Sequence, residues 1–330
     1  MRLAARTVLK AANTSALLVS DLVNVRYLTG VCVSSGVVLV LPSSFLFFVD
    51  SRYREMAEEN RLPGVSVRDI AGLEKAMTTV RICGFESAHV TVESLQRWKK
   101  KFKNTKFVQV RGAVECFRRS KDKEELLLIG RSARITAELL RRIPASLRAG
   151  ITERALAWKI EQWARELGAE SMSFDPIVAF GAHTSRPHHR PTTKRLQRGH
   201  IVQIDIGVKY RGYCSDRSCV YFTGKISAEY KRAYQAVREA KDTAKRAVKA
   251  GMSTRALDRI ARDVLKKYDM EKYFTHSLGH GVGLEIHEGV SLSAKAPDVK
   301  LLKNEVITIE PGVYVPGKFG MRVEDMVFVM

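Results

Sequence analysis

The sequence predicts a two-domain protein of the α/β (α+β) class. Its 330 residues exceed the size at which a single hydrophobic core is usual. Short apolar runs alternate with helical stretches in the first third, and the second half contains an internal repeat. We therefore expect an N-terminal α/β domain at residues 1–118 and a second domain of two related halves at residues 119–330.

The first domain is predicted from the spacing of its apolar runs. The basic residues and the absence of acids over residues 1–20 would suit a transit-like peptide, but an amphipathic first helix that runs into a buried strand at residues 16–20 is the preferred interpretation. From residue 121 to residue 143 the pattern becomes that of one long amphipathic helix beginning at Ser120, which would connect the domains. Strands are expected near residues 16–20, 36–41, 45–49, 80–84 and 106–110, with helices between them.

The repeat lies in the second domain. Ala149-Gly-Ile-Thr-Glu-Arg-Ala-Leu156 is echoed by Ala250-Gly-Met-Ser-Thr-Arg-Ala-Leu257. Each copy has a glycine that can end one helix, a hydroxyl residue that can cap the next, and then an apolar stripe. A histidine-containing segment and a β-hairpin follow each copy. Two α+β halves related by a pseudo-twofold axis would explain this arrangement.

The two predicted hairpins carry paired acids in otherwise apolar strands. With a turn centred between Tyr210 and Arg211, Asp205 and Asp216 would lie directly opposite each other, where like charges repel. With a turn centred on Gly317, Glu310 would face Glu324. Four carboxylates that converge in a buried site cannot all stay ionised without compensation, and two divalent cations would supply it.

The histidines strengthen this interpretation. His280 lies among Gly279, Gly281 and Gly283, and such glycine density implies close approach of the backbone to another group. One neutral imidazole with four carboxylates suits a dinuclear Mn, Co, Fe or Zn site better than Ca or Mg. In such sites a bridging water becomes a hydroxide near neutral pH and attacks a polarised carbonyl.

The second domain contains the motifs Asp205-Ile-Gly207, Ser215-Asp216, Gly279-His-Gly-Val-Gly283 with His287-Glu288, Glu310-Pro-Gly312 and Arg322-Val-Glu-Asp325. Together these motifs resemble those of the proline-specific metallopeptidases, the Xaa-Pro aminopeptidases and Xaa-Pro dipeptidases, which have the pita-bread fold. In the first domain Asn24-Val-Arg-Tyr-Leu-Thr-Gly30, Val49-Asp-Ser-Arg-Tyr53 and Phe85-Glu-Ser-Ala-His89 look like the family's creatinase-type N-terminal domain. The resemblance covers nearly the whole chain.

The resemblance implies a role for each matched residue. Asp205 and Asp216 would hold one metal ion, His280 and Glu310 the second, and Asp216 and Glu324 would bridge the two. Glu310 would also take the proton of the attacking water or assist its transfer, and Arg322 would either lie behind the ligands or bind a carboxylate. His188 and His287 would stabilise the tetrahedral intermediate, and His276 would line the proline pocket. The expected ions are two per chain, Mn first, with Co, Zn or Fe as alternatives, and the expected substrates are peptides with proline in the second position.

The sequence departs from the family pattern at positions that are not predicted ligands. Ser218 and Cys219 stand where Thr-Arg is usual, Val290 where a proline is common, and His183 where an asparagine is often found. The chain ends at Met330, where relatives usually continue with a closing strand. We also expect a homodimer.

The composition leaves one alternative of another class. The net charge of +21, with aromatics among lysines at Arg97-Trp-Lys-Lys-Lys-Phe-Lys-Asn-Thr-Lys106, is compatible with a non-catalytic binding module for nucleic acid or an acidic partner. However, residues 101–150 carry 13 basic and 5 acidic residues, whereas residues 301–330 carry 3 and 4. The basic excess is therefore expected on the outer helices. A metal-free, creatinase-like amidinohydrolase is disfavoured because all four carboxylates are present.

Other compositional features bound the class of protein. With 28% charged residues and no low-complexity tract, the chain is neither disordered nor collagen-like. The apolar run from Val37 to Phe48 is too short and too interrupted to cross a bilayer. Five scattered cysteines without CxxC spacing favour reduced thiols in a cytoplasm.

Overall fold

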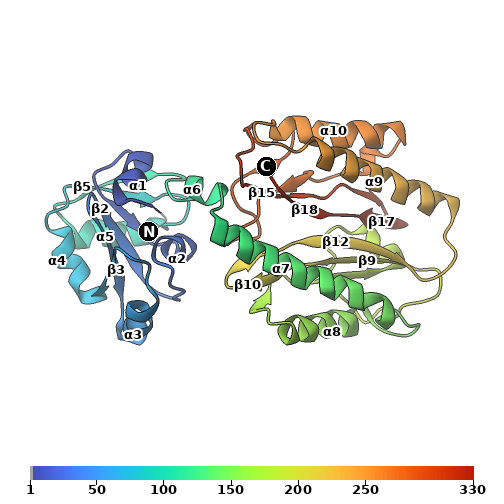
Figure 1. The fold of residues 1–330 in the computed structure, drawn as a ribbon, viewed down its shortest axis with the longest axis horizontal. Coiled ribbons are helices and arrows are strands. Elements are labelled where there is room, and N and C mark those ends of the chain that lie inside the picture. The colour runs from blue at the N-terminus through green and yellow to red at the C-terminus, as the bar shows by residue number, and fades with distance from the viewer. Residues whose placement is uncertain (1–2) are drawn as a thin grey trace. The chain divides into compact units, whose positions relative to one another are not determined.

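The structure is a computed structural model that describes residues 3–330. The chain divides into two compact units, Met1–Arg118 and Arg119–Met330 (Figure 1). Among the described residues, no helix has both the length and the apolar character that a membrane crossing requires.

The first unit is built on a six-stranded mixed sheet with the strand order β4-β3-β2-β1-β5-β6. β1, β2 and β3 pair antiparallel, and the outer pairings with β4, β5 and β6 are parallel. The predicted strands are all present, but β4 was not predicted because only Val65 and Val67 mark its apolar side. The strands are β1 (Leu17–Val19), β2 (Val37–Leu41), β3 (Ser44–Val49), β4 (Val65–Asp69), β5 (Ile82–Glu86) and β6 (Lys106–Val110).

Helices connect these strands, and several begin at a capping side chain. The carboxylates of Asp21 and Asp50 and the hydroxyl of Thr91 accept a backbone N–H of the first turn of α2, α3 and α5. The helices are α1 (Ala5–Ala12), α2 (Leu22–Thr29), α3 (Ser51–Asn60), the 3₁₀ turn η1 (Ile70–Gly72), α4 (Leu73–Met77), α5 (Val92–Lys101) and α6 (Glu115–Arg119).

The second unit opens with the long helix α7 (Lys123–Arg142). The prediction that this helix begins at Ser120 was wrong by a few residues. Asp122 is the N-cap, because its side chain accepts the N–H of Glu125 while the Glu125 side chain accepts the N–H of Asp122. This reciprocal capping box fixes the start of the helix more strongly than a lone hydroxyl would. The 3₁₀ turn η2 (Ile143–Ser146) follows.

The internal repeat is present in the structure. α8 (Glu153–Glu166) and α10 (Thr254–Lys267) have the same length and are capped by Thr152 and Ser253. The glycines ahead of them, Gly150 and Gly251, have φ values of 90° and 82°, a left-handed conformation that other residues rarely adopt. The residues Thr152 and Ser253 also form equivalent isolated bridges, to Arg195 and Lys300.

Strands lie between two layers of helices in this unit (Figure 1). α7 and α8 pack against β8, β9 and β10, and α9 (Ala228–Ala247) packs with α10 against β15, β16 and β17. The strands are β7 (Ser171–Met172), β8 (Ile177–Phe180), β9 (Ile201–Ile206), β10 (Val208–Tyr210), β11 (Tyr213–Cys214), β12 (Arg217–Phe222), β13 (Gly279–His280), β14 (Ser291–Leu292), β15 (Val306–Ile309), β16 (Gly312–Val315), β17 (Phe319–Arg322) and β18 (Asp325–Phe328). The 3₁₀ turns are η3 (Gly181–Ser185) and η4 (Glu271–Tyr273).

The register of the first hairpin differs from the prediction. Asp205 pairs with Ser218 rather than with Asp216. The turn is centred between Arg211 and Gly212, both with positive φ (45° and 77°), as the tight two-residue turns of hairpins require. The predicted register was therefore off by two residues. A two-residue slip keeps both aspartates on one face of the sheet, so they become diagonal neighbours instead of an opposed pair.

The register of the second hairpin agrees with the prediction. β16 pairs with β17 so that Gly312 lies opposite Arg322, and β15 pairs with β18 so that Ile309 lies opposite Asp325. Both ladders share the turn centred on Gly317, and this register places Glu310 opposite Glu324.

Candidate metal centre

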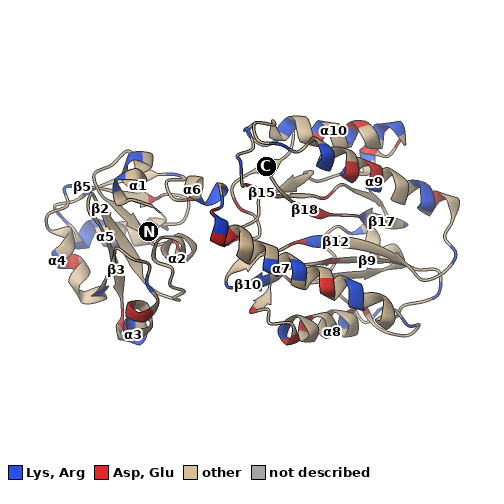
Figure 2. Ribbon diagram, in the orientation of Figure 1, with Lys and Arg blue, Asp and Glu red and all other residues tan. Residues whose placement is uncertain are grey.

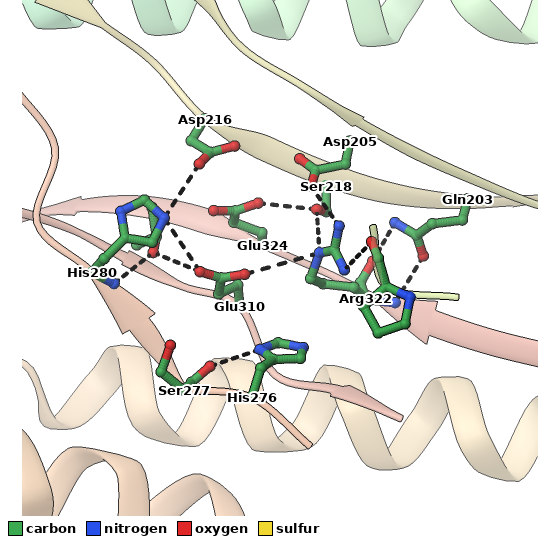
Figure 3. A network of polar contacts seen from close by, with 12 residues as sticks. Gln203, Asp205, Asp216, Ser218, His276, Ser277, His280, Glu310, Arg322 and Glu324 are labelled. Atoms are coloured by element: carbon green, nitrogen blue, oxygen red, sulfur yellow. Dashed lines mark hydrogen bonds and ion pairs between the residues drawn. The ribbon is translucent and has the colours of Figure 1, made fainter. Parts of the chain in front are cut away.

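Five predicted ligands converge between the two hairpins and β13 (Figure 3). Asp205 lies in β9, Asp216 directly precedes β12, and Glu324 directly precedes β18. Their exposed fractions are 7%, 7% and 2%. Single ligand atoms of Asp216, Glu324 and His280 all lie within 4.8 Å of one another. The apolar strands thus bury charged side chains that they would normally exclude.

The orientation of His280 is that of a metal ligand. Its Nδ1 lies 3.0 Å from the carbonyl oxygen of Gly281, so Nδ1 carries the proton and donates it there. The unprotonated Nε2 then faces carboxylate oxygens of Asp216 and Glu310, each at 3.4 Å. A lone pair that faces two carboxylates is repelled by them unless a cation lies between.

Buried oxygens without a hydrogen-bond partner also indicate a cation site. Among the described residues, the buried oxygens without a hydrogen-bond partner include Asp205 Oδ1, Asp216 Oδ1 and Glu324 Oε1. Burial, together with the neighbouring carboxylates, raises the pKa of Asp216 and that of Glu324 well above their ordinary values. Without a bound cation, the buried site thus disfavours the ionised form that these carboxyl groups have in water. Divalent cations would partner these oxygens and restore the charged state, so the residues present fit a metal centre.

Arg322 holds the carboxylates from the opposite side of the centre. It forms an ion pair with Asp205, and its Nε lies 3.9 Å from Glu310 Oε2. The same Nε donates a hydrogen bond to Ser218 Oγ at 3.0 Å, and Ser218 donates in turn to Glu324 at 3.0 Å. Ser218, one of the departures from the family pattern, is therefore part of the support for the centre.

The predicted histidines meet in one pocket beside the centre. The pocket has a volume of about 620 Å³, and His188, His276 and His287 line it together with the carboxylates of Asp205 and Asp216. The rings of His287 and His280 are 4.2 Å apart between centroids. Burial, together with the neighbouring imidazoles of His280 and His188, lowers the pKa of His287, which favours the neutral imidazole with one N–H to donate.

Sequence reasoning missed several residues that support these groups. Tyr314 lies between His276 Nε2, at 3.0 Å, and Arg322, which donates to its hydroxyl. Gln203 accepts the N–H of Arg322 at 2.8 Å, and Thr308 donates to Glu310 at 3.2 Å. One signal was available for Gln203, since it is the only uncharged polar residue in the strand Ile201–Ile206. The role of Tyr314 had no comparable signal, because an aromatic residue in a strand is ordinary.

A buried centre of carboxylates and one imidazole, open to a pocket lined with histidines, is typical of a metal-dependent hydrolase. Comparison with known sequences gives the family. The profile of metallopeptidase family M24 matches residues 128–330, and that of the creatinase/prolidase N-terminal domain matches residues 2–120. The chain belongs to metallopeptidase family M24.

Individual relatives match over almost the full chain. An Xaa-Pro dipeptidase of Pyrococcus furiosus is 34% identical over 93% of this chain and 88% of its own length. An uncharacterized peptidase of Bacillus subtilis is 32% identical over 95% of this chain and 90% of its own.

Solved structures show the same likeness. The Xaa-Pro dipeptidase from Bacillus anthracis superposes with a TM-score of 0.95 at 31% identity, over 99% of this chain and 94% of that one. The X-Pro aminopeptidase from Thermotoga maritima superposes with a TM-score of 0.91 at 31% identity, over 98% and 94%. The expected fold, a creatinase-type N-terminal domain followed by a pita-bread catalytic domain, is confirmed.

Proposed function

We propose that this protein hydrolyses the peptide bond between an N-terminal residue and a proline, using two divalent metal ions. The observation that carries the proposal is a cluster of buried carboxylates with unpartnered oxygens, those of Asp205, Asp216 and Glu324. Asp205 and Asp216 line the pocket together with His280. Relatives whose names specify Xaa-Pro substrates support the choice of bond.

The proposed ligands divide between the two ions. Asp205 and Asp216 would hold one ion, and His280 and Glu310 the other, and Asp216 and Glu324 would serve both. We propose Mn as the native metal, with Co, Zn or Fe as the competing choices, because one imidazole among carboxylates suits these ions. When bound, the ions supply the Lewis acidity that polarises the scissile carbonyl and activates water.

The chain's own residues then bind the substrate and move protons. Glu310 lies at the pocket wall, where its carboxylate can accept a proton from the attacking water. His188 and His287 face the same pocket and can donate hydrogen bonds to the oxygen on which negative charge develops. His276 lines the pocket for the proline ring, and Arg322 holds Asp205 in place through an ion pair. An Xaa-Pro bond is a tertiary amide without an N–H, so recognition must come from shape and from the carbonyl.

A hydrolysis assay tests the proposal directly. Metal-free protein is supplied with Mn, Co, Zn or Fe and assayed on an Xaa-Pro dipeptide beside an Xaa-Pro-Yaa tripeptide. The matched controls are the same peptides with alanine in place of proline. Release of the first residue from the proline substrates alone is expected. Absence of release from both proline substrates with every metal would contradict the proposal.

Three further properties are proposed with it. The unit boundary after Arg118 marks the border between the N-terminal and catalytic domains, and limited proteolysis would locate it. The protein is a homodimer, which light scattering tests. It works in a reducing, cytoplasmic compartment, where its five free cysteines stay reduced.

The binding-module alternative gains no support. Figure 2 shows Lys and Arg along the helices, including α7, α9 and α10, as the charge distribution in the sequence predicted. None of the comparisons favours a nucleic-acid or acidic partner.

A further inference from the structure

One buried carboxylate holds the loop that carries His188. Glu153 is the first residue of α8, and its side chain is fully buried. It accepts the backbone N–H of Phe180 at 2.8 Å and that of Thr192 at 2.9 Å. These two residues flank residues 181–191, so a single side chain ties the two ends of the loop together.

Two imidazoles bind to the same carboxylate. His183 Nδ1 lies 2.9 Å from one oxygen of Glu153, and His189 Nε2 lies 2.9 Å from the other. Burial acts to raise the pKa of Glu153, but hydrogen bonds from Thr192, His189 and Phe180 outweigh it and leave this pKa below its ordinary value. The carboxylate is therefore ionised, and both imidazoles act as donors toward it.

The distances between the Glu153 oxygens and the two imidazole nitrogens are those of hydrogen bonds and not those of ligands around a third metal ion. Glu153, His183 and His189 could in principle hold an ion, since their ligand atoms gather within 4.8 Å. However, ligands around a tetrahedral ion with bonds of about 2.0–2.1 Å lie roughly 3.3 Å apart. At the metal centre His280 Nε2 is 3.4 Å from its two carboxylates, whereas here both N···O distances are 2.9 Å, typical of N–H···O bonds.

The position of His188 depends on this cluster. His189 is buried, whereas His188 is exposed and lines the pocket. Among the described residues, the His188 side chain has no hydrogen-bond partner, so its place follows from the backbone on either side. On one side the carbonyl of Pro187 accepts from Arg322 at 3.4 Å, and on the other His189 is bound to Glu153.

We propose that Glu153, His183 and His189 form a positioning cluster that sets where the His188 imidazole meets the scissile carbonyl. This inference rests on the proposed function, in which His188 donates a hydrogen bond to the carbonyl oxygen. A catalytic group displaced by about 1 Å can lose roughly 100-fold in rate, so the cluster controls turnover without contacting the substrate.

Paired substitutions at His189 test the inference. In His189→Gln the amide nitrogen takes nearly the place of Nε2 and keeps a donor for Glu153, whereas His189→Leu removes it. We expect His189→Leu to lower kcat by about 10- to 100-fold with KM and a content of two metal ions per chain unchanged. His189→Gln should stay within about threefold of wild type. If His189→Leu does not fold, His183→Leu against His183→Asn gives the same comparison, since the Asn amide replaces Nδ1.

A double-mutant cycle identifies the target of the cluster. In a His188→Ala background, His189→Leu should cause no further loss, because the group that it displaces is already absent. A full additional loss in that background would overturn the inference, as would wild-type kcat in His189→Leu. A third bound ion in the wild type that both His189 variants lose would instead establish a metal site.

Failure of the proposed function would be seen separately. It would appear as wild-type protein that hydrolyses no Xaa-Pro substrate with any metal. The positioning role then has its own readout in the histidine ring NMR signals. The His188 signals should shift in His189→Leu and remain near the wild-type position in His189→Gln, and unchanged His188 signals in both variants would refute it.

Discussion

Gly207 lies where the first hairpin has no room for a side chain. A Cβ atom at this position would be 1.8 Å from the carbonyl oxygen of Ser215, whereas real Cβ contacts essentially never fall below 3.0 Å. In Gly207→Ala the two backbone segments must therefore separate by at least 1.2 Å, the difference between these distances. Because the obstacle is backbone, no side-chain rotation can relieve it.

This separation acts directly on the proposed ligands. Asp216 follows Ser215, and Asp205 precedes Gly207 by two residues. Metal–ligand distances tolerate about 0.2 Å. A displacement of 1.2 Å is about six times that tolerance, so we expect Gly207→Ala to lose at least one of two ions per chain and more than 100-fold in activity. Overpacking of this kind also costs about 1–3 kcal/mol of stability.

Metal analysis with a matched glycine variant provides the assay. Gly130 lies inside α7, where a methyl group added at its Cα would have nothing within 4 Å, and its φ is not positive. Gly130→Ala should keep both ions and full activity, and should gain about 0.5–1 kcal/mol because alanine favours the helix. Metal content is measured after reconstitution with Mn and dialysis. Two tightly bound ions and wild-type turnover in Gly207→Ala would refute the reasoning.

Three further predictions concern the centre and its pocket. Asp216→Ala or Glu324→Ala should abolish hydrolysis, since each removes a proposed bridging ligand, and near-wild-type turnover in either would contradict the assignment. Removal of metal with a chelator should lower the melting temperature, and Mn should restore it. An ion present at 1,000 times its Kd contributes about 4 kcal/mol to the free energy of unfolding, which sets the size of the shift. An unchanged melting temperature would contradict a link between metal binding and folding. Burial and the charge of Arg322 lower the pKa of His276 to about 4 from an ordinary 6.5. Between these two pH values the His276 imidazole is protonated in the unfolded chain but not in the folded protein. The free energy of unfolding therefore falls as the pH drops through this range. Urea unfolding of the metal-free proteins measures this effect. Between pH 7 and pH 4 the free energy of unfolding of the wild type should fall by about 3 kcal/mol more than that of His276→Gln. Equal decreases in the two proteins would contradict the role assigned to His276.

The sequence was sufficient to predict the second hairpin but not the register of the first. At Gly317 the centre of the turn coincides with a glycine that takes positive φ, so counting outward pairs Glu310 with Glu324. In the first hairpin Arg211 adopts positive φ beside Gly212, a conformation that an arginine does not signal. The predicted centre of the turn was therefore one residue too early in the sequence, and Asp205 was paired with Asp216 instead of Ser218.

The supporting contacts were harder to predict than the ligands. A charged residue in an apolar strand conflicts with its surroundings, and such conflicts mark functional positions. Asp205 within its strand, and Asp216 and Glu324 directly before theirs, all produce this conflict, and each is buried. The bond from Glu153 to His189 spans 36 residues and joins the start of a helix to a loop. Each partner alone has an ordinary explanation, Glu153 as an acid in the first turn of a helix and His189 as a loop residue.

This difference follows from how each kind of residue depends on its neighbours. Each proposed ligand lies in a strand or directly next to one, and the strand's period of two fixes the face on which the side chain lies. His188 is on a loop between a 3₁₀ turn and a strand, and loop conformation depends on contacts from distant parts of the chain. The acids could thus be recognised one strand at a time, whereas the position of His188 depends on Glu153, Arg322 and the loop acting together. A protein with every ligand intact could therefore still lose turnover through the cluster around Glu153, and the paired variants at His189 measure that dependence.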